Sequence, residues 1–308
     1  MVVLEGFAAR GGRLEKSNVA SVSAAARARP TNCARYFITW TGGAECRSVA
    51  AASGPARGRT ELAERNATAA VVGAGDFIGA AIAKKFAAEG FTIFAGRRNA
   101  DKLAPLVSDI EAAGGKVVAR GLDARKEEDI TAFLRAADAH APLEVCIFNV
   151  GGNVNFPLLD TTERVFRKVW ELACYAGFLT GREAARLMLS RGQGCIFFTG
   201  ATASMRGGVG YAAFASAKSG LRSVAQSMAR ELGPKNIHVA HLVIDAGVDT
   251  AFVRERIRQQ SGAEALERLD ADQLMHPSSV AEAYWQLYRQ PRDAWTFELD
   301  MRPYREVW

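Results

Sequence analysis

From about residue 68 onward, short apolar runs alternate with segments whose apolar side chains have helical spacing. The apolar runs fall at residues 69–72, 91–96, 116–123, 144–152, 194–200 and 237–244. Strands separated by helices are typical of βαβ units, in which a parallel sheet is buried on both faces. We therefore predict an α/β fold built on a doubly wound sheet of six parallel strands.

A glycine-rich turn, VVGAGDFIGAAIA, follows the first predicted strand and opens a helix. In such a turn Gly73 allows the tight bend, Gly75 lets the backbone approach a pyrophosphate, and Gly79 lets the helix pack closely on the strand. The helix N-terminus offers unpaired N–H groups to the anion. The turn predicts a dinucleotide site of the Rossmann type, and a structural turn without a ligand is the alternative.

The end of the second predicted strand indicates which dinucleotide is bound. Dehydrogenases that use NAD usually place a carboxylate there to accept the ribose 2′-hydroxyl. Residues 91–100 contain no carboxylate, and the strand ends in Arg97 and Arg98. Guanidinium groups pair with a 2′-phosphate through charge-assisted hydrogen bonds, so we predict NADP rather than NAD. The alternative is that both arginines are only solvated at the strand end.

The positive charge of the chain is concentrated at its N-terminal end. Residues 1–60 contain nine Arg or Lys and three Glu, an excess that equals the net charge of +6 for the whole sequence. The remaining residues are balanced, so the charge does not predict a nucleic-acid surface on the core. We predict one domain at residues 66–308. Residues 1–65 are then a low-complexity basic extension, either disordered or a targeting segment.

The remaining features of the composition argue against a metal site and against a membrane span. The five cysteines have no ligand spacing, and His238 and His241 fall on opposite faces of a strand, so no metal site is predicted. No apolar stretch reaches the length of a membrane span. We expect a cytoplasmic protein, or one of an organelle matrix if the extension is a transit peptide.

Several segments from about residue 68 to residue 231 resemble the short-chain dehydrogenase/reductase family in order and spacing. The glycine turn is similar to that family's TGxxxGxG motif, with Phe77 in place of the middle glycine. Asp123 stands where an acid touches the adenine. In FNVGG, Asn149 and Gly151 resemble the second Asn and the Gly of the NNAG motif.

A later segment, VIDAGVDT, resembles the PGxVxT motif of the same family, with Asp245 and Ala246 in place of Pro and Gly. The resemblance implies that Val248 and Thr250 lie beside the nicotinamide. Together with the glycine turn and the two arginines, the residues that it assigns to the cofactor are Phe77, Ile78, Asp123, Asn149, Gly151, Lys218, Val248 and Thr250.

The active-site positions depart from the family pattern. Lys218 matches the lysine of YxxxK, but its tyrosine falls on Phe214, the serine on Ala201 and the helix asparagine on Cys174. The resemblance implies that the tyrosine gives a proton to the developing alkoxide while the lysine lowers its pKa and holds the ribose. Phenylalanine has no proton to give, so carbonyl reduction by the usual set of side chains is not expected.

Tyr211 is the candidate for a different proton donor. It precedes Lys218 by seven residues, and YAAFASAKSGL resembles the divergent branch of the family that reduces enoyl thioesters. On one helix the pair would be separated by two turns, about 10 Å along the axis, so the phenol would extend over a substrate while Lys218 binds ribose. The alternative is an ordinary packed tyrosine.

The segments around the core point to a covered cleft and to an oligomer. The resemblance implies that residues 253–308 cover the substrate cleft and that a strand at residues 294–300 extends the sheet. Helices at residues 161–190, interrupted at Gly177, and at residues 211–232 resemble the family's subunit interface, so we expect a homodimer or homotetramer that acts on a small molecule.

Two functions remain open from the sequence. The first is an NADP-dependent oxidoreductase that transfers hydride to a carbonyl or an activated double bond with an altered proton donor, using Lys218 and Tyr211. The second is an NADP-binding pseudoenzyme with a structural or regulatory role, which the residues at positions 174, 201 and 214 favour.

Overall fold

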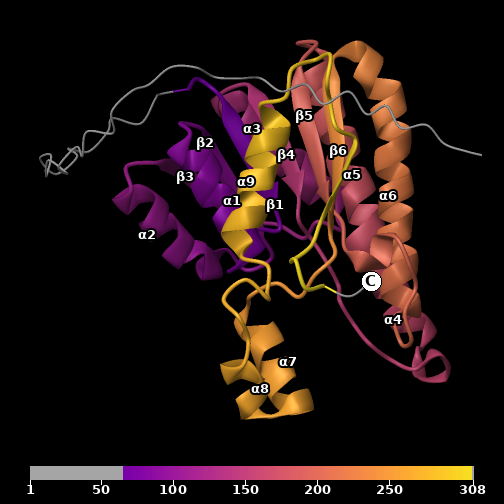
Figure 1. The fold of residues 1–308 in the computed structure, drawn as a ribbon. Coiled ribbons are helices and arrows are strands. Elements are labelled where there is room, and N and C mark those ends of the chain that lie inside the picture. Colours follow the sequence, from indigo (N-terminus) through magenta and orange to yellow (C-terminus); the bar gives the residue numbers. More distant parts are fainter. Residues whose placement is uncertain (1–64, 307–308) are drawn as a thin grey trace, which may run out of the picture. The chain divides into compact units, whose positions relative to one another are not determined.

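The computed structural model describes residues 65–306, which contain one parallel β-sheet (Figure 1). The strand order is β3-β2-β1-β4-β5-β6-β7, and every neighbouring pair is parallel. The strands are β1 (Thr68–Val72), β2 (Thr92–Arg97), β3 (Lys116–Gly121), β4 (Leu143–Phe148), β5 (Gly194–Thr199), β6 (Ile237–Ile244) and β7 (Glu298–Met301). The predicted doubly wound parallel sheet is confirmed, and β7 is its seventh strand.

The sheet separates two hydrophobic cores. Alternate side chains of β1 enter one core or the other: Ala69 and Val71 pack on one face, and Ala70 and Val72 on the opposite face. A strand that must fill both cores has to be apolar throughout, because successive side chains point to opposite faces. This requirement explains the uninterrupted apolar runs of the sequence.

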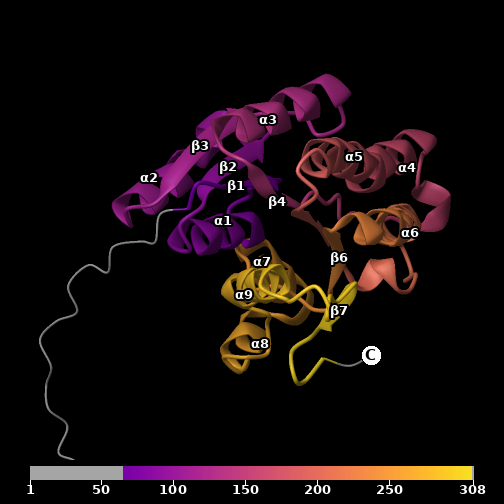
Figure 2. The ribbon, with the colours of Figure 1, turned by 90° about the horizontal axis from the view of Figure 1, so that it is seen from above.

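Helices cover both faces of the sheet (Figure 2). Helices α1, α2 and α9 pack on one face, and α3, α5 and α6 on the other. The helices are α1 (Ile78–Ala88), α2 (Ala104–Ala112), α3 (Glu127–His140), α4 (Glu163–Trp170), α5 (Ala176–Leu189), α6 (Ala212–Leu232), α7 (Ala251–Ser261), α8 (Ala263–Glu267) and α9 (Pro277–Tyr288). Because the helices cover the faces of the sheet, the loops at the carboxyl ends of the strands are not covered by them and can form a site.

The expected helix interruption at Gly177 is wrong. Gly177 lies inside α5, and the irregular stretch is instead a π-helical turn at Glu171–Tyr175 between α4 and α5. A Cβ atom on Gly177 would stand 2.3 Å from Cδ1 of Leu221 on α6. The glycine therefore serves the close packing of α5 on α6 and does not break the helix.

The C-terminal segment leaves the sheet and returns to it. After β6, α7 and α8 extend beyond the carboxyl ends of the strands, and α9 then packs against α1 (Figure 1). The strand expected at residues 294–300 is β7, which starts four residues later than predicted and pairs with β6. The segment thus completes the sheet and brings α7 to the edge where the site forms.

The predicted extension, apart from Arg65, lies outside the described residues. Among residues 65–306, no helix combines the length and the apolar character needed to cross a membrane.

Candidate cofactor and active site

A cavity of about 670 Å³ opens at the carboxyl ends of β1, β4, β5 and β6. Its walls come from segments that are far apart in the sequence: the glycine turn, the segment after β4, the start of α6 and the segment after β6. Of the residues that the sequence assigned to a site, it brings together Gly73, Gly75, Phe77, Ile78, Gly79, Asn149, Gly151, Tyr211, Lys218, Val248 and Thr250. Arg97, Arg98 and Asp123 do not line it.

The glycines of the turn meet different surroundings. Gly73 has a φ of +92°, and a Cβ atom there would lie 2.7 Å from the Asn149 carbonyl oxygen. A Cβ on Gly79 would lie 2.4 Å from the carbonyl oxygen of Gly73, whereas a Cβ on Gly75 would meet nothing within 4 Å. Gly73 and Gly79 are therefore required by the fold itself. The open space at Gly75 is available to a ligand.

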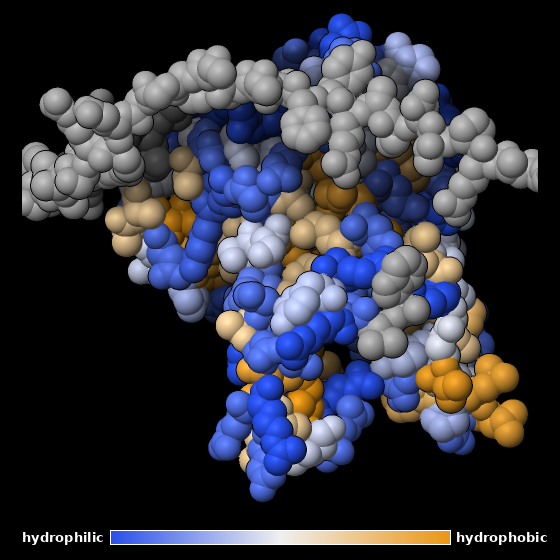
Figure 3. Space-filling model, in the orientation of Figure 1, coloured by the Kyte–Doolittle hydropathy of each residue, from blue (hydrophilic) through white to orange (hydrophobic). Residues whose placement is uncertain are grey.

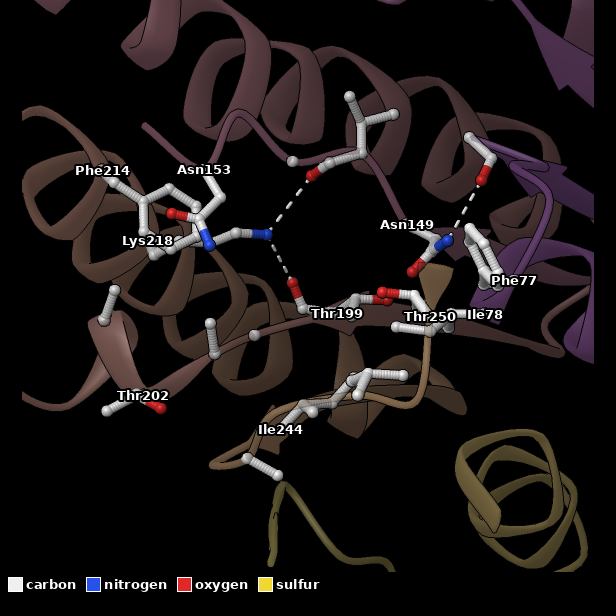
Figure 4. Close-up of a pocket in the computed structure, with 18 of the residues that line it drawn as sticks. Phe77, Ile78, Asn149, Asn153, Thr199, Thr202, Phe214, Lys218, Ile244 and Thr250 are labelled. Carbon is white, nitrogen blue, oxygen red and sulfur yellow. Dashed lines mark hydrogen bonds between the residues drawn. The ribbon is translucent and has the colours of Figure 1, made fainter. Parts of the chain in front are cut away.

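Ile78 and Gly79, the first residues of α1, line the same cavity. Phe77 precedes the helix, and no side chain caps α1. Uncapped N–H groups and the positive end of the helix dipole favour an anion. This end of the cavity, with Phe77 and Ile78 at the right of Figure 4, therefore fits a diphosphate.

Asn149 holds the two loops together. Its side-chain amide donates a hydrogen bond to the carbonyl oxygen of Gly73 at 3.0 Å, and its backbone N–H donates to Val72. The segments after β1 and β4 are thus locked side by side (Figure 4). The resemblance assigned Asn149 to cofactor support, and the geometry shows that it supports the turn.

Lys218 is almost fully buried and extends from α6 toward the segment after β4. Its ammonium donates hydrogen bonds to the carbonyl oxygens of Val150 at 3.2 Å and Thr199 at 2.9 Å (Figure 4). Burial lowers the pKa of Lys218 from 10.5 to about 8. An ammonium has three N–H donors, so one remains for a ligand in the cavity that Lys218 lines.

The three side chains that the sequence resemblance aligned with the other reacting groups of the family are apolar or buried. Phe214 and Ala201 line the cavity, and the Phe214 ring centroid lies 6.0 Å from the Lys218 ammonium. Cys174 is buried in the π-helical turn against α6, and burial raises the pKa of its thiol. Phe214 and Ala201 have no acidic proton, and Cys174 does not line the cavity, so none of the three is placed to donate a proton to a ligand there.

Tyr211 lines the cavity. The sequence placed it inside the helix of Lys218, whereas the structure places it at the N-cap of that helix. Helix α6 begins at Ala212, and Tyr211 is the residue before it, with φ −107° and ψ 19°. Its hydroxyl oxygen accepts a hydrogen bond from Arg256 of α7 at 3.0 Å. Its backbone carbonyl oxygen accepts a hydrogen bond from the N–H of Ala215, so Tyr211 caps the helix that contains Lys218.

The two arginines after β2 have different surroundings. Arg97 forms an ion pair with Asp76 of the glycine turn at 2.5 Å, and this hydrogen bond lowers the pKa of the Asp76 carboxyl. Arg98 is exposed. Arg97 is thus engaged by a carboxylate, whereas Arg98 is not, and the binding of a 2′-phosphate by both guanidinium groups stays a prediction.

Asp123 lies in the same region but is paired inside the protein. Its carboxylate accepts hydrogen bonds from Arg125, which lower its pKa, and the charge of Arg98 lowers it further. Asp123 and Arg98 are therefore neighbours outside the cavity wall, next to the end of β2.

Sequence reasoning missed Asp76 and Arg206. Asp76 lies in the glycine turn itself. Because β1 and β2 are parallel neighbours, the ends of both strands lie together, which brings Asp76 close to Arg97. Arg206 lines the opposite end of the cavity and is held by the buried Asp245, which the sequence comparison noted only as a replaced proline. A search for charged residues in loops that follow neighbouring strands would have found both.

No group of three or more His, Cys, Asp or Glu residues within 65–306 could hold a metal ion. His238 binds the Thr296 carbonyl oxygen, and His241 faces Glu298 on β7. Burial lowers the pKa of His241 to about 4, so its imidazole is neutral at pH 7.

The fold and the cavity define a dinucleotide-binding protein, and a family match gives it a class. Residues 67–261 match the short chain dehydrogenase family, to which the chain belongs. The matched span contains the glycine turn, β1 to β6 and the whole of α6. The chain is thus an oxidoreductase of the short-chain dehydrogenase type.

Individual relatives place the chain within this family. The 7alpha-hydroxysteroid dehydrogenase of Escherichia coli (strain K12) is 27% identical over 216 residues, which cover 70% of this chain and 84% of that protein. A short-chain dehydrogenase from Rhodopseudomonas palustris is similar in structure, with 68% identity and a TM-score of 0.67, over 78% of this chain and 100% of that chain. Actinorhodin polyketide ketoreductase, at 24% identity and a TM-score of 0.71 over 77% and 97%, shares the fold.

Proposed function

We propose that the protein is an NADP-dependent oxidoreductase that reduces a carbonyl or an activated double bond. The observation that carries the proposal is the buried ammonium of Lys218, which keeps one N–H donor for the cavity that also contains the glycine turn. When bound, NADPH supplies a hydride to the substrate carbon, and a proton from the protein or water completes the reduction.

The residues present fit this cofactor. The open side of Gly75 and the uncapped start of α1 suit the diphosphate, and Lys218 suits the hydroxyl groups of the ribose. Val248 and Thr250 follow β6 and line the same cavity, where the reactive ring would lie. Asn149 positions the turn through its bond to Gly73.

The preference for NADP rests on Arg98. Its guanidinium is exposed at the end of β2, whereas Arg97 is neutralised by Asp76. Asp123, the nearest acid beyond β3, is engaged by Arg125 and so does not offer a free carboxylate to the ribose 2′-hydroxyl. A single exposed guanidinium is enough to form charge-assisted hydrogen bonds with a 2′-phosphate.

Tyr211 is the proposed proton donor. A tyrosine hydroxyl has one O–H donor and two acceptor sites. Because Arg256 occupies an acceptor site, the phenolic proton stays free to be given to a substrate in the cavity. The donor is thus provided from the residue before α6, at a different place from the phenol of the usual YxxxK motif.

A second function is favoured by the apolar pair Phe214 and Ala201. Both line the cavity where the family pattern places a hydroxyl group, so the site can bind the cofactor without the usual reaction. In this alternative the protein is an NADP-binding pseudoenzyme with a structural or regulatory role.

Two measurements on the same preparation separate these functions. Equilibrium titration with NADPH tests the site, and loss of NADPH absorbance in the presence of ketones, quinones and enoyl thioesters tests the chemistry. We expect binding and turnover with one of these classes. Binding without turnover above background for all three would favour the pseudoenzyme, and absence of binding would refute both functions.

We also propose a homo-oligomer formed through α4 and α5, with residues 66–308 as the working domain. Phe166, Trp170 and Phe178 expose large apolar side chains on these helices and the turn between them. Figure 3 shows a further apolar group over the loop that precedes α4, where Phe156, Leu158 and Leu159 are exposed. Light scattering of the chain with and without residues 1–65 tests both parts of this proposal.

A further inference from the structure

The end of the cavity opposite the glycine turn is positively charged. Within residues 65–306, the charged side chains that line the cavity are Asp76, Arg206 and Lys218. Asp76 belongs to the cofactor end and is neutralised by Arg97. The substrate end, which contains Thr202 and Phe214 at the left of Figure 4, therefore has a guanidinium and no carboxylate on its wall.

Arg206 is held in place by a buried carboxylate. Its two terminal nitrogens donate to the two oxygens of Asp245 at 3.0 and 3.1 Å. Asp245 is 1% exposed, and it also accepts a hydrogen bond from Thr202 at 2.6 Å and faces Arg302 at 3.5 Å. A paired, parallel geometry of this kind fixes the guanidinium plane. Arg206 is therefore oriented before any ligand arrives.

This cluster pairs two guanidinium groups with two carboxylates, so its formal charges balance, but it leaves N–H donors of Arg206 unused. Two guanidinium groups, those of Arg206 and Arg302, share Asp245, and Arg302 also contacts Asp300. Arg206 uses two of its five N–H donors on Asp245, and no other protein acceptor within residues 65–306 engages it. Three donors are left on a side chain that is 44% exposed and lines the cavity.

A second guanidinium approaches from α7. Arg256 is partly buried, and it donates to the Tyr211 hydroxyl at 3.0 Å. Its neighbours Arg254 and Arg258 are paired with Asp249 and Glu255, but within the described chain no carboxylate pairs with Arg256. A partly buried cation without a counter-ion raises the positive potential around Tyr211.

We propose that the substrate is a small carbonyl compound that carries a carboxylate, which Arg206 binds and which the unpaired charge of Arg256, beside the cavity at Tyr211, attracts. This inference rests on the proposed reductase function and names its substrate class. The carboxylate meets the three N–H donors that Arg206 does not use on Asp245, in a guanidinium plane that is already fixed. The group to be reduced then lies near Tyr211, between the arginines and the cofactor end of the cavity.

The test compares a keto acid with a neutral partner of the same size. 5-Oxohexanoate and 5-oxohexanamide have the same size and differ only at the terminal group, a carboxylate in one and a neutral amide in the other, so their kcat/KM ratio measures recognition of the carboxylate. A charge-assisted hydrogen bond predicts a ratio of about tenfold or more in favour of the acid. The KM of the acid should also rise with ionic strength, because salt screens the attraction.

Variants assign this preference to residues. Arg206→Gln and, independently, Arg256→Gln should each bring the ratio of acid to amide toward one. Arg206→Gln leaves Asp245 with fewer partners, so Arg256→Gln tests the proposal if the first variant does not fold. Arg268→Gln is the matched control, because Arg268 is an exposed arginine on the last turn of the neighbouring helix and pairs with Glu264.

A binding experiment separates failure of this inference from failure of the proposed reduction. Hexanoate and hexanamide have no ketone, so calorimetry on the NADPH-loaded protein measures recognition without turnover. Tighter binding of hexanoate, lost in Arg206→Gln or Arg256→Gln, would support the carboxylate site even in a protein without activity. Equal binding of hexanoate and hexanamide, or a preference that survives both variants, would overturn it.

Discussion

The hydroxyl oxygen of Tyr211 accepts a hydrogen bond from the guanidinium of Arg256 at 3.0 Å. The contact joins the residue before α6 to α7. It fixes the phenol while leaving its proton unused, and this arrangement motivates the first prediction.

Replacing Tyr211 with Phe should lower kcat by a factor of about 100 or more, since general acid catalysis contributes that much. NADPH affinity should stay within about threefold of the unmodified protein, because the phenol does not belong to the glycine turn. Single-turnover oxidation of NADPH and equilibrium titration measure the two quantities. Tyr304→Phe, at an exposed tyrosine, is the control. An unchanged kcat in Tyr211→Phe would exclude this residue as the donor.

The glycine turn offers a matched pair of substitutions. Gly79→Ala should destabilise the fold, because its Cβ would stand 2.4 Å from the carbonyl oxygen of Gly73, and we expect a loss of about 1–3 kcal/mol in urea unfolding. Gly75→Ala meets no protein atom within 4 Å, so stability should hold while NADPH affinity falls. If Gly75→Ala bound NADPH normally, the diphosphate would not lie against this glycine.

Arg98 should determine the choice between the two dinucleotides. Arg98→Gln should weaken NADPH binding about tenfold and leave NADH binding nearly unchanged, since only NADPH carries the 2′-phosphate. Arg97→Gln should have a smaller effect on this ratio because Asp76 already neutralises Arg97. Fluorescence titration with NADPH and with NADH measures the ratio of the two affinities. Arg292→Gln, at an exposed arginine, is the control. Equal affinity of the unmodified protein for NADPH and NADH would contradict the NADP assignment.

Lys218 should make the stability of the protein depend on alkaline pH. Its pKa is lowered in the folded state, so between the folded and unfolded values the unfolded chain binds the additional proton, and stability rises with pH. The contribution grows by up to about 3 kcal/mol between pH 8 and pH 10.5. Burial raises the pKa of Cys146 and Cys195 to about 12, so their ionisation in the unfolded chain opposes this trend, but they are common to both proteins in a comparison with Lys218→Met.

Urea unfolding of the two proteins at pH 7.5, 9 and 10 measures this difference. The stability of the unmodified protein relative to Lys218→Met should increase with pH across this series. A difference that stays constant would mean that the amino group titrates at its ordinary value and is not desolvated. Lys84→Met, at an exposed lysine paired with Asp109, should show no such trend.

The sequence predicted the sheet because burial on both faces leaves a pattern in each strand, as Ala69 to Val72 show. It misjudged Gly177, since a glycine within a helix has the same local signature whether it interrupts the helix or admits a neighbour. The contact with Leu221 that decides the matter joins residues 44 positions apart. Local propensity does not encode such a contact.

The sequence predicted those site residues that belong to a short, contiguous motif. The glycine turn, Asn149 and Lys218 were identified from short motifs, and all of them line the cavity or its turn. Arg206 and Asp245 were not, because they come from loops after β5 and β6 that meet only when the strands are parallel neighbours. Arg97 was assigned to the cofactor because its partner Asp76 lies 21 residues earlier.

The absence of a side chain at Gly177 affects the position of Lys218 indirectly, through Leu221. Leu221, which fills that gap, lies one helical turn beyond Lys218 on α6. A methyl group at position 177 would push this turn outward and draw the ammonium away from Val150 and Thr199. The position of the lysine therefore depends on a contact between α5 and α6, made by two residues that do not line the cavity.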